Sequence, residues 1–132
     1  RRTNGDVVTA SYRRGQLHGT ETVSDAGGQT LTVQQWVDGI RHGAWQSFFA
    51  SGRRAEEGSY RDGQRDGVWI EWAPTGAMIK EVRYQRGVLD GTWRSFYPNG
   101  QIEVEGTWRA DEPTGKWTYY RPDGTIEREV DR

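Results

Sequence analysis

Glutamates recur at one position of this 132-residue sequence and are its most regular candidates for chemistry. They stand 24 residues apart, at Glu57, Glu81, Glu105 and Glu129, with Val33 at the equivalent earlier position. Neighbouring carboxylates can bind a cation, or act as the acid and base of a carbohydrate hydrolase. Catalysis needs one site to differ from the rest, whereas periodicity makes the sites alike. The structural alternative is that each glutamate caps a turn amide or pairs with a nearby arginine, namely Arg53, Arg54, Arg83 or Arg94.

A second periodic position holds His18, His42, Asp66 and Asp90, each directly before a glycine. Histidine is the commonest metal ligand in proteins. These two histidines stand a full repeat apart, however, and aspartates replace them later in the chain. A polar residue that stabilises a turn explains all four positions, and this is the role we expect.

Motifs of the common enzyme classes are absent. We find no nucleophile elbow, phosphate-cradling glycine loop, zinc-ligand spacing or dinucleotide fingerprint, and the chain has no cysteine. We therefore predict no catalytic residues, no metal site and no cofactor, and expect that the chain is not an enzyme. The 18 Lys plus Arg against 19 Asp plus Glu also lack the basic excess of most nucleic-acid binders. RNA or DNA binding through arginines and stacking aromatics stays open as an alternative.

A 24-residue repeat positions all these residues. Glycines keep this period in three rows: Gly19, Gly43, Gly67, Gly91 and Gly115; Gly28, Gly52, Gly76, Gly100 and Gly124; and Gly15, Gly39, Gly63 and Gly87, which breaks at Asp111. Aromatic residues form three more: Tyr12, Trp36, Tyr60, Tyr84 and Trp108; Trp45, Trp69, Trp93 and Trp117; and Phe48, Trp72, Phe96 and Tyr120. Several registers that agree over four or five copies identify a repeat protein.

Each copy contains two short segments separated by glycine turns such as Pro98-Asn99-Gly100. Segments this short, rich in Trp, Tyr, Val and Thr, are typical of strands joined in hairpins. The prediction is an all-β fold, a single-layer elongated antiparallel sheet of consecutive hairpins with roughly ten strands. It forms one array over 1–132, with partial copies at 1–18 and 115–132 and full copies at 19–42, 43–66, 67–90 and 91–114.

Three stretches of the chain resemble a known family. They are GVWIEWAPTGAMIKEVRYQRGVLDG from Gly67, GTWRSFYPNGQIEVEGTW from Gly91 and GKWTYYRPDGTIEREV from Gly115. They resemble the MORN repeat (membrane occupation and recognition nexus) in its bacterial variant form. The resemblance implies a row of β-hairpins in one long twisted sheet. Bacterial members of this type are often described as antitoxins or immunity proteins of toxin systems, and other members bind partner proteins or lie near membranes.

Side chains alternate between the faces of a strand, so the two aromatic rows of each copy's first strand point in opposite directions. We predict a structural role for the row on one face and for the aromatics of the second strands: Trp45, Trp69, Trp93, Trp117, Tyr60, Tyr84 and Trp108. The opposite row and three aromatics that the repeat does not require are candidates for partner binding: Phe48, Trp72, Phe96, Tyr120, Phe49, Tyr97 and Tyr119. A structural role for the opposite row, and simple drift for the other three, are the alternatives.

Taken with the resemblance, these features predict a non-enzymatic protein-binding module. The expected role is that of an antitoxin or immunity protein that neutralises a toxic bacterial effector by direct binding. The alternative is a membrane-proximal scaffold that contacts lipid headgroups or other proteins, although a net charge of −1 disfavours it. The expected partner is a protein and not a nucleic acid. Because the sequence begins at Arg1 without an initiator Met, a leader could precede it, which favours the bacterial periplasm or cell envelope over the cytoplasm.

Overall fold

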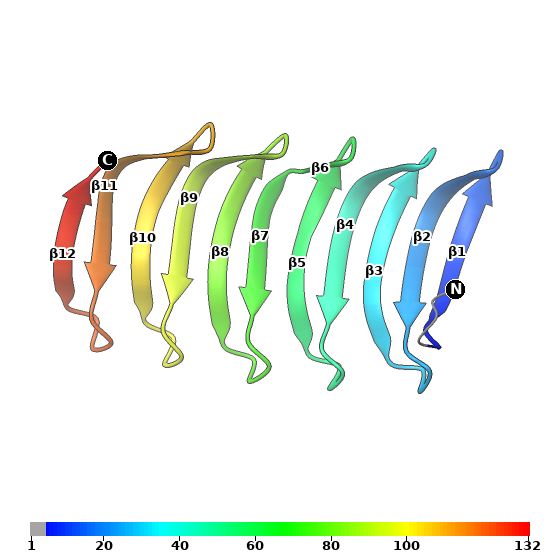
Figure 1. Ribbon diagram of the computed structural model, residues 1–132, viewed down its shortest axis with the longest axis horizontal. Coiled ribbons are helices and arrows are strands. Elements are labelled where there is room, and N and C mark those ends of the chain that lie inside the picture. The colour runs from blue at the N-terminus through cyan, green and yellow to red at the C-terminus, as the bar shows by residue number, and fades with distance from the viewer. Residues whose placement is uncertain (1–4) are drawn as a thin grey trace.

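The computed structural model describes residues 5–132, so the start of the partial copy at 1–18, with Arg1, lies outside the described residues. These residues form one antiparallel sheet of twelve strands in chain order (Figure 1). The strands are β1 (Val7–Arg13), β2 (Gln16–Ser24), β3 (Thr30–Val37), β4 (Ile40–Phe48), β5 (Arg54–Arg61), β6 (Gln64–Arg65), β7 (Gly67–Trp72), β8 (Met78–Gln85), β9 (Val88–Phe96), β10 (Ile102–Arg109), β11 (Glu112–Tyr120) and β12 (Ile126–Asp131). The predicted all-β sheet of consecutive hairpins is confirmed. The number exceeds the expected ten because the partial copies supply strands and the short β6 is separate from β7.

Two kinds of turn alternate along the sheet (Figure 1). At one end, two-residue turns such as Asp38-Gly39 and Asp62-Gly63 have positive φ at both residues, as a type I′ hairpin requires. The equivalent pair Ala110-Asp111 adopts the same conformation, with φ of 49° and 70°, without any glycine. The fold therefore imposes the turn even where the glycine row breaks.

Longer turns at the other end close each hairpin around a glycine. Gly100 and Gly124 have φ near 90°, a region that favours glycine. Asn99 Oδ1 accepts a hydrogen bond from the Gln101 amide at 2.9 Å, and Asp123 Oδ1 accepts one from the Thr125 amide at 2.9 Å. The polar residues of the repeat's turns thus stabilise the turn backbone.

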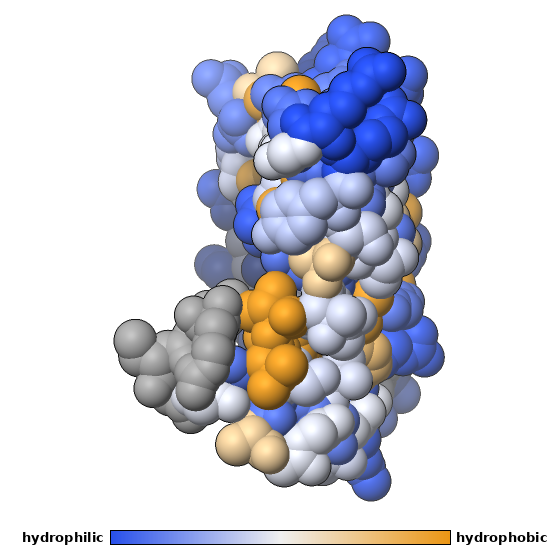
Figure 2. Space-filling model, turned by 90° about the vertical axis from the view of Figure 1, so that its right-hand side faces the viewer, coloured by the Kyte–Doolittle hydropathy of each residue, from blue (hydrophilic) through white to orange (hydrophobic). Residues whose placement is uncertain are grey.

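The strand registers give the sheet two faces. Trp45 lies opposite Gln34 and Gly58 on what we call the tryptophan face, defined by Trp45, Trp69, Trp93 and Trp117. Glu57 lies opposite Gln46 and Ile70 on the reverse side, the glutamate face, defined by Glu57, Glu81, Glu105 and Glu129. Seen from the β1 end the molecule is narrow (Figure 2), and residues 5–132 supply no second layer over either face.

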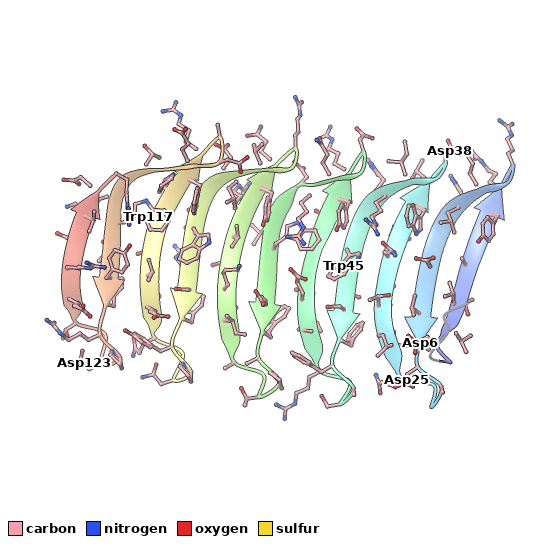
Figure 3. The ribbon with its side chains drawn as sticks, viewed as in Figure 1. Asp6, Asp25, Asp38, Trp45, Trp117 and Asp123 are labelled. Carbon is pink, nitrogen blue, oxygen red and sulfur yellow. The ribbon has the colours of Figure 1, made fainter. Side chains whose placement is uncertain are left out.

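The core lies on the tryptophan face. Trp69 is 3% exposed and Trp117 5%, and Val82 and Val23 are also buried. Trp45 and Trp93 are only half-buried. Figure 3 labels Trp45 and Trp117, which project from β4 and β11 in different copies. With so few aliphatic residues, the aromatic rings provide most of the buried area.

Candidate functional site

The tryptophans pack in two pairs on the tryptophan face. The ring centroids of Trp45 and Trp69 lie 5.5 Å apart, and those of Trp93 and Trp117 lie 5.6 Å apart. Both buried members make a hydrogen bond through the indole nitrogen, from Trp69 Nε1 to the Ser59 carbonyl at 3.1 Å and from Trp117 Nε1 to the Thr114 carbonyl at 3.2 Å. This pairing gives the 24-residue sequence repeat a 48-residue structural alternation.

Arginines stack on this aromatic layer. The Arg65 guanidinium lies 4.4 Å from the ring centroid of Trp69, and its Nη1 donates to Tyr84 Oη at 3.3 Å. Burial lowers the pKa of Arg65, but hydrogen bonds to Tyr84 and Tyr60 outweigh it, so the pKa is raised overall. Arg65 stays charged and serves as a cation–π partner, so its contacts are made within the face.

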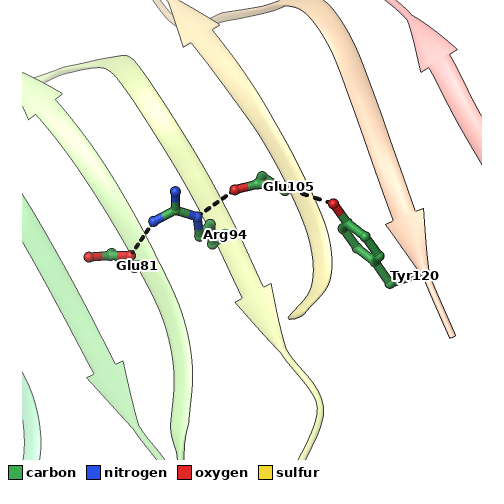
Figure 4. Close-up of polar contacts among 4 residues, drawn as sticks. All are labelled: Glu81, Arg94, Glu105 and Tyr120. Atoms are coloured by element: carbon green, nitrogen blue, oxygen red, sulfur yellow. Dashed lines mark hydrogen bonds and ion pairs between the residues drawn. The ribbon is translucent and has the colours of Figure 1, made fainter. Parts of the chain in front are cut away.

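The glutamates of the glutamate face are paired with cations. Arg94 bridges two of them, with Nη1 3.2 Å from Glu81 Oε1 and Nε 2.6 Å from Glu105 Oε2 (Figure 4). The hydroxyl of Tyr120 donates to Glu105 Oε1 at 3.4 Å. The hydrogen bond to Glu105 is the main cause of a raised pKa of Arg94, whereas burial, then Glu105, raises the pKa of Tyr120.

The two outer glutamates follow the same rule. Glu57 Oε2 lies 3.0 Å from Arg54 Nη1, and Glu129 Oε1 lies 3.8 Å from Lys116 Nζ. Pairing with a nearby arginine is thereby confirmed for three row members, with a lysine at the fourth. Each carboxylate is held by a cation of the same sheet face, as in a structural ion-pair network.

The residues of the histidine register support turns, as predicted. His18 Nδ1 and His42 Nδ1 accept hydrogen bonds from the amides of Asp38 and Asp62, at 3.2 and 3.3 Å. The equivalent acceptors in later copies are Asp66 Oδ1, which binds the Arg86 amide at 3.1 Å, and Asp90 Oδ1, which binds the Ala110 amide at 3.4 Å. The acceptor always binds the first residue of the next two-residue turn. Within residues 5–132, no three His, Asp or Glu side chains converge as metal ligands would.

The second aromatic row lies along the glutamate face, near the longer turns. Its four members are half-buried side chains at the ends of β4, β7, β9 and β11: Phe48, Trp72, Phe96 and Tyr120. The Arg54 guanidinium lies 5.0 Å from the Trp72 ring centroid. Arg53, Arg54 and Trp72 line a hollow between the turns that contain Gly52 and Gly76. This row is a continuous aromatic surface with one cation stacked on it.

The other three candidate aromatics do not lie together. Phe49 is half-buried at the start of a turn. The hydroxyl of Tyr97 donates to the Tyr120 carbonyl of the next hairpin at 2.7 Å. Tyr119 lies on the tryptophan face, opposite Val104, with the Arg128 guanidinium 4.4 Å from its ring centroid. Tyr97 and Tyr119 therefore both have structural contacts, and Tyr119 lies on the opposite face of the sheet from the aromatic row.

Sequence reasoning missed two features of the glutamate face. One is the stacking of Arg54 on Trp72. The other is a group of arginines near the two-residue turns, Arg61, Arg83 and Arg86, which line one hollow. The available signal was departure from the repeat, because the position of Arg83 holds Ser59 and Thr107 in other copies.

Comparisons with known proteins agree with this architecture. A model of the MORN repeat variant matches residues 41–62 and 89–110, and a model of the MORN repeat matches 35–44, 57–68 and 105–126. No curated protein matches the chain.

Solved structures also match the chain in part. A Staphylococcus aureus TarM mutant in complex with fondaparinux, a GlcNAc-glycerol and UDP is 11% identical over 83% of this chain, with a TM-score of 0.48. A further TarM crystal structure is 12% identical over 97% of this chain, with a TM-score of 0.41. This chain spans 21% of the length of each. Likenesses this weak carry no inference about function.

The family assignment rests on three agreeing observations. The sequence repeats every 24 residues, the structure is one sheet of consecutive antiparallel hairpins, and both family models match within that array. Repeats of this kind indicate a repeat-based binding module. This chain belongs to the MORN repeat family.

Proposed function

We propose that this chain is a non-enzymatic protein-binding module that acts as an antitoxin or immunity protein. It neutralises a toxic bacterial effector by covering or distorting the effector's working surface. The match to the MORN repeat variant supports this proposal, because bacterial proteins of that type are often described in such roles. A repeat fold alone does not specify a function, so the proposal depends on what the surface offers a partner.

The observation that carries the proposal is the uncovered aromatic row of the glutamate face. Phe48, Trp72, Phe96 and Tyr120 stand at equivalent positions of successive hairpins, about 10 Å apart at two strands per copy. No second layer among residues 5–132 lies over them. Large aromatic side chains held on a rigid sheet are the anchors that protein interfaces favour, and they lose little conformational entropy on binding.

Charged pairs beside this row supply specificity. The Glu81–Arg94–Glu105 network lies on the same face, and each of its members is partly exposed. Charges at the border of an interface mainly determine partner choice and association rate. A partner with complementary charges is therefore selected by this network and held by the aromatic row.

Affinity capture from a lysate of the source cell tests the proposal. We expect one stoichiometric partner that carries a toxin domain, and we expect that co-expression of this chain restores growth of cells that produce that partner. Trp72→Ala should weaken both capture and growth protection. Ile40→Ala is the matched control, because Ile40 is a 51% exposed apolar residue at the opposite end of the hairpins.

Three results would overturn the proposal. One is capture of lipid alone or of nothing. Another is a stoichiometric partner that is harmless when produced by itself. The third is equal loss of binding in both variants. Capture of lipid alone would direct the next measurement to liposome binding, as expected of a membrane-proximal scaffold.

A further inference from the structure

Three arginine side chains surround one polar hollow on the glutamate face, close to the two-residue turns. Arg61 ends β5, Arg83 lies in β8, and Arg86 begins the turn that follows β8. Gly67 of β7, the strand between β5 and β8, lines the same hollow without a side chain. Three guanidinium groups from separate segments thus converge on one space.

These guanidinium groups are unused within the described part of the chain. Arg61, Arg83 and Arg86 are exposed, and their side chains make no hydrogen bond, ion pair or ring contact with residues 5–132. In contrast, Arg54 and Arg94 are both engaged with glutamates. Each guanidinium carries five N–H donors, so the hollow concentrates donors without acceptors.

The repeat does not require an arginine at any of the three positions. Ser59 and Thr107 are equivalent to Arg83. The equivalents of the other two arginines include Gln85 for Arg61, and Asp62 and Ala110 for Arg86. Because other copies fold with these residues, the need to form a strand or a turn does not account for the three arginines.

The backbone helps to hold the cluster in place. A Cβ atom on Gly91 would lie 2.7 Å from the Cδ of Arg83, so the aliphatic stem of Arg83 runs across this glycine. Asp66 Oδ1 accepts a hydrogen bond from the Arg86 amide at 3.1 Å, which holds the turn that carries Arg86. A preorganised group of donors loses less entropy when a ligand binds.

We propose that this arginine cluster docks one short acidic segment of a protein partner, through one or two aspartate or glutamate carboxylates. Guanidinium groups bind carboxylates with paired N–H donors, which gives both strength and orientation. Asp66 and Asp90 line the same hollow, so three cations and two anions leave a local charge of only +1. A continuous polyanion, such as nucleic acid or an anionic membrane, would also meet these two carboxylates, whereas a discrete carboxylate fits between the cations.

The site deepens the proposed function and rests on it for the identity of the partner. The aromatic row lies on the same face at the other end of the strands. Strands of up to nine residues, such as β9, separate the two surfaces by about 25–30 Å. A partner that covers the glutamate face therefore reaches both surfaces, with apolar contacts at one end and an acidic segment at the other.

An NMR titration of the full chain with an N-acetylated tri-glutamate amide tests the site. We expect saturable shifts confined to the side-chain Nε–Hε signals of Arg61, Arg83 and Arg86 and to the amide of Gly67. Arg83→Thr and Arg61→Gln introduce residues that the chain already uses at equivalent positions, so both variants should fold. Each should weaken peptide binding at least about fivefold, which corresponds to about 1 kcal/mol.

Arg109→Gln is the matched control, because Arg109 has the register of Arg61 and lies outside the hollow. We expect its affinity for the peptide to stay within about twofold of that of the unaltered chain, which is under 0.5 kcal/mol. Absence of saturable shifts, equal weakening by Arg109→Gln, or tighter binding of an oligothymidylate of equal charge would each overturn the site. Peptide binding without any captured toxin would refute the immunity role alone, and a captured toxin without peptide binding would refute this site alone.

Discussion

The indole ring of Trp69 lies directly over Gly58 of the neighbouring strand, so that a Cβ atom on Gly58 would overlap the ring. Trp117 lies in the same way over Gly106, 48 residues further along the chain. The half-buried Trp45 and Trp93 instead lie opposite Gln34 and Val82, which have side chains. A glycine on the preceding strand thus accompanies each tryptophan that sinks fully into the sheet.

Replacing Trp69 by Ala should cost about 3–5 kcal/mol of unfolding free energy, because it removes a 97% buried ring and leaves a cavity. Trp45→Ala should cost clearly less, because Trp45 is half-buried. Urea unfolding followed by circular dichroism measures both. Equal losses in the two variants would contradict the unequal burial of the tryptophan pair.

Removing the Tyr97 hydroxyl with Tyr97→Phe should cost about 1 kcal/mol, because the Tyr120 carbonyl loses its bond to the neighbouring hairpin. Phe49→Ala, at the equivalent position of an earlier copy, should leave Tm nearly unchanged and weaken partner binding. Thermal unfolding and binding to the captured partner separate the two effects. A large fall in Tm for Phe49→Ala would instead assign Phe49 to the structure.

His42→Asn should preserve the bond that the Asp62 amide donates, whereas His42→Asp should place a second carboxylate beside that of Asp62, now 3.6 Å from His42 Nδ1. We expect the aspartate variant to be less stable by about 0.5–1 kcal/mol at low ionic strength, with a smaller difference in high salt. Adding Asp62→Arg to His42→Asp reproduces the Asp66–Arg86 pairing and should recover the loss. Unfolding curves that are identical for the Asn and Asp variants would argue against this.

Stability should depend on pH through Asp123. Hydrogen bonds from the Thr125 hydroxyl and amide lower the pKa of the Asp123 carboxyl. Because folding lowers this pKa, the stabilisation is present above the unfolded value of about 3.9 and is lost as pH falls through the folded value. The Tm advantage of the unaltered chain over Asp123→Asn should therefore be present near neutral pH and vanish in acid. Asp131→Asn, at an exposed carboxyl at the end of β12, should show no such change, and a pH-independent advantage over Asp123→Asn would contradict the assignment.

Replacing Ala110 by Asn should stabilise the chain by about 0.5–1 kcal/mol. Ala110 has a φ of 49°, where alanine is strained and asparagine is tolerated. Chemical unfolding measures the gain. Ala50→Asn, in one of the longer turns, provides a comparison at a residue without positive φ, and an equal gain there would exclude relief of strain as the cause.

Much of the candidate site was predictable from residue types alone. The opposite orientation of Trp69 and Glu81 follows from strand alternation, and the turn role of His42 follows from the aspartates at its register. The distribution of the partner candidates was not predictable in the same way. Tyr97 and Tyr119 both depart from the repeat, yet each contacts a residue of a neighbouring strand, and such contacts depend on how the hairpins stack.

By itself, the sequence determined the 24-residue repeat, the order of strands and turns, and the side chains that share a face. These features follow from local conformational preference and from the two-residue period of a strand. Only the tertiary structure decided which tryptophans are buried and where arginines are left unpaired. Burial of Trp69 depends on Gly58 of the preceding strand, and the free donors of Arg83 depend on the absence of an acceptor within reach. Both are relationships between strands, and a pattern within one strand does not contain them.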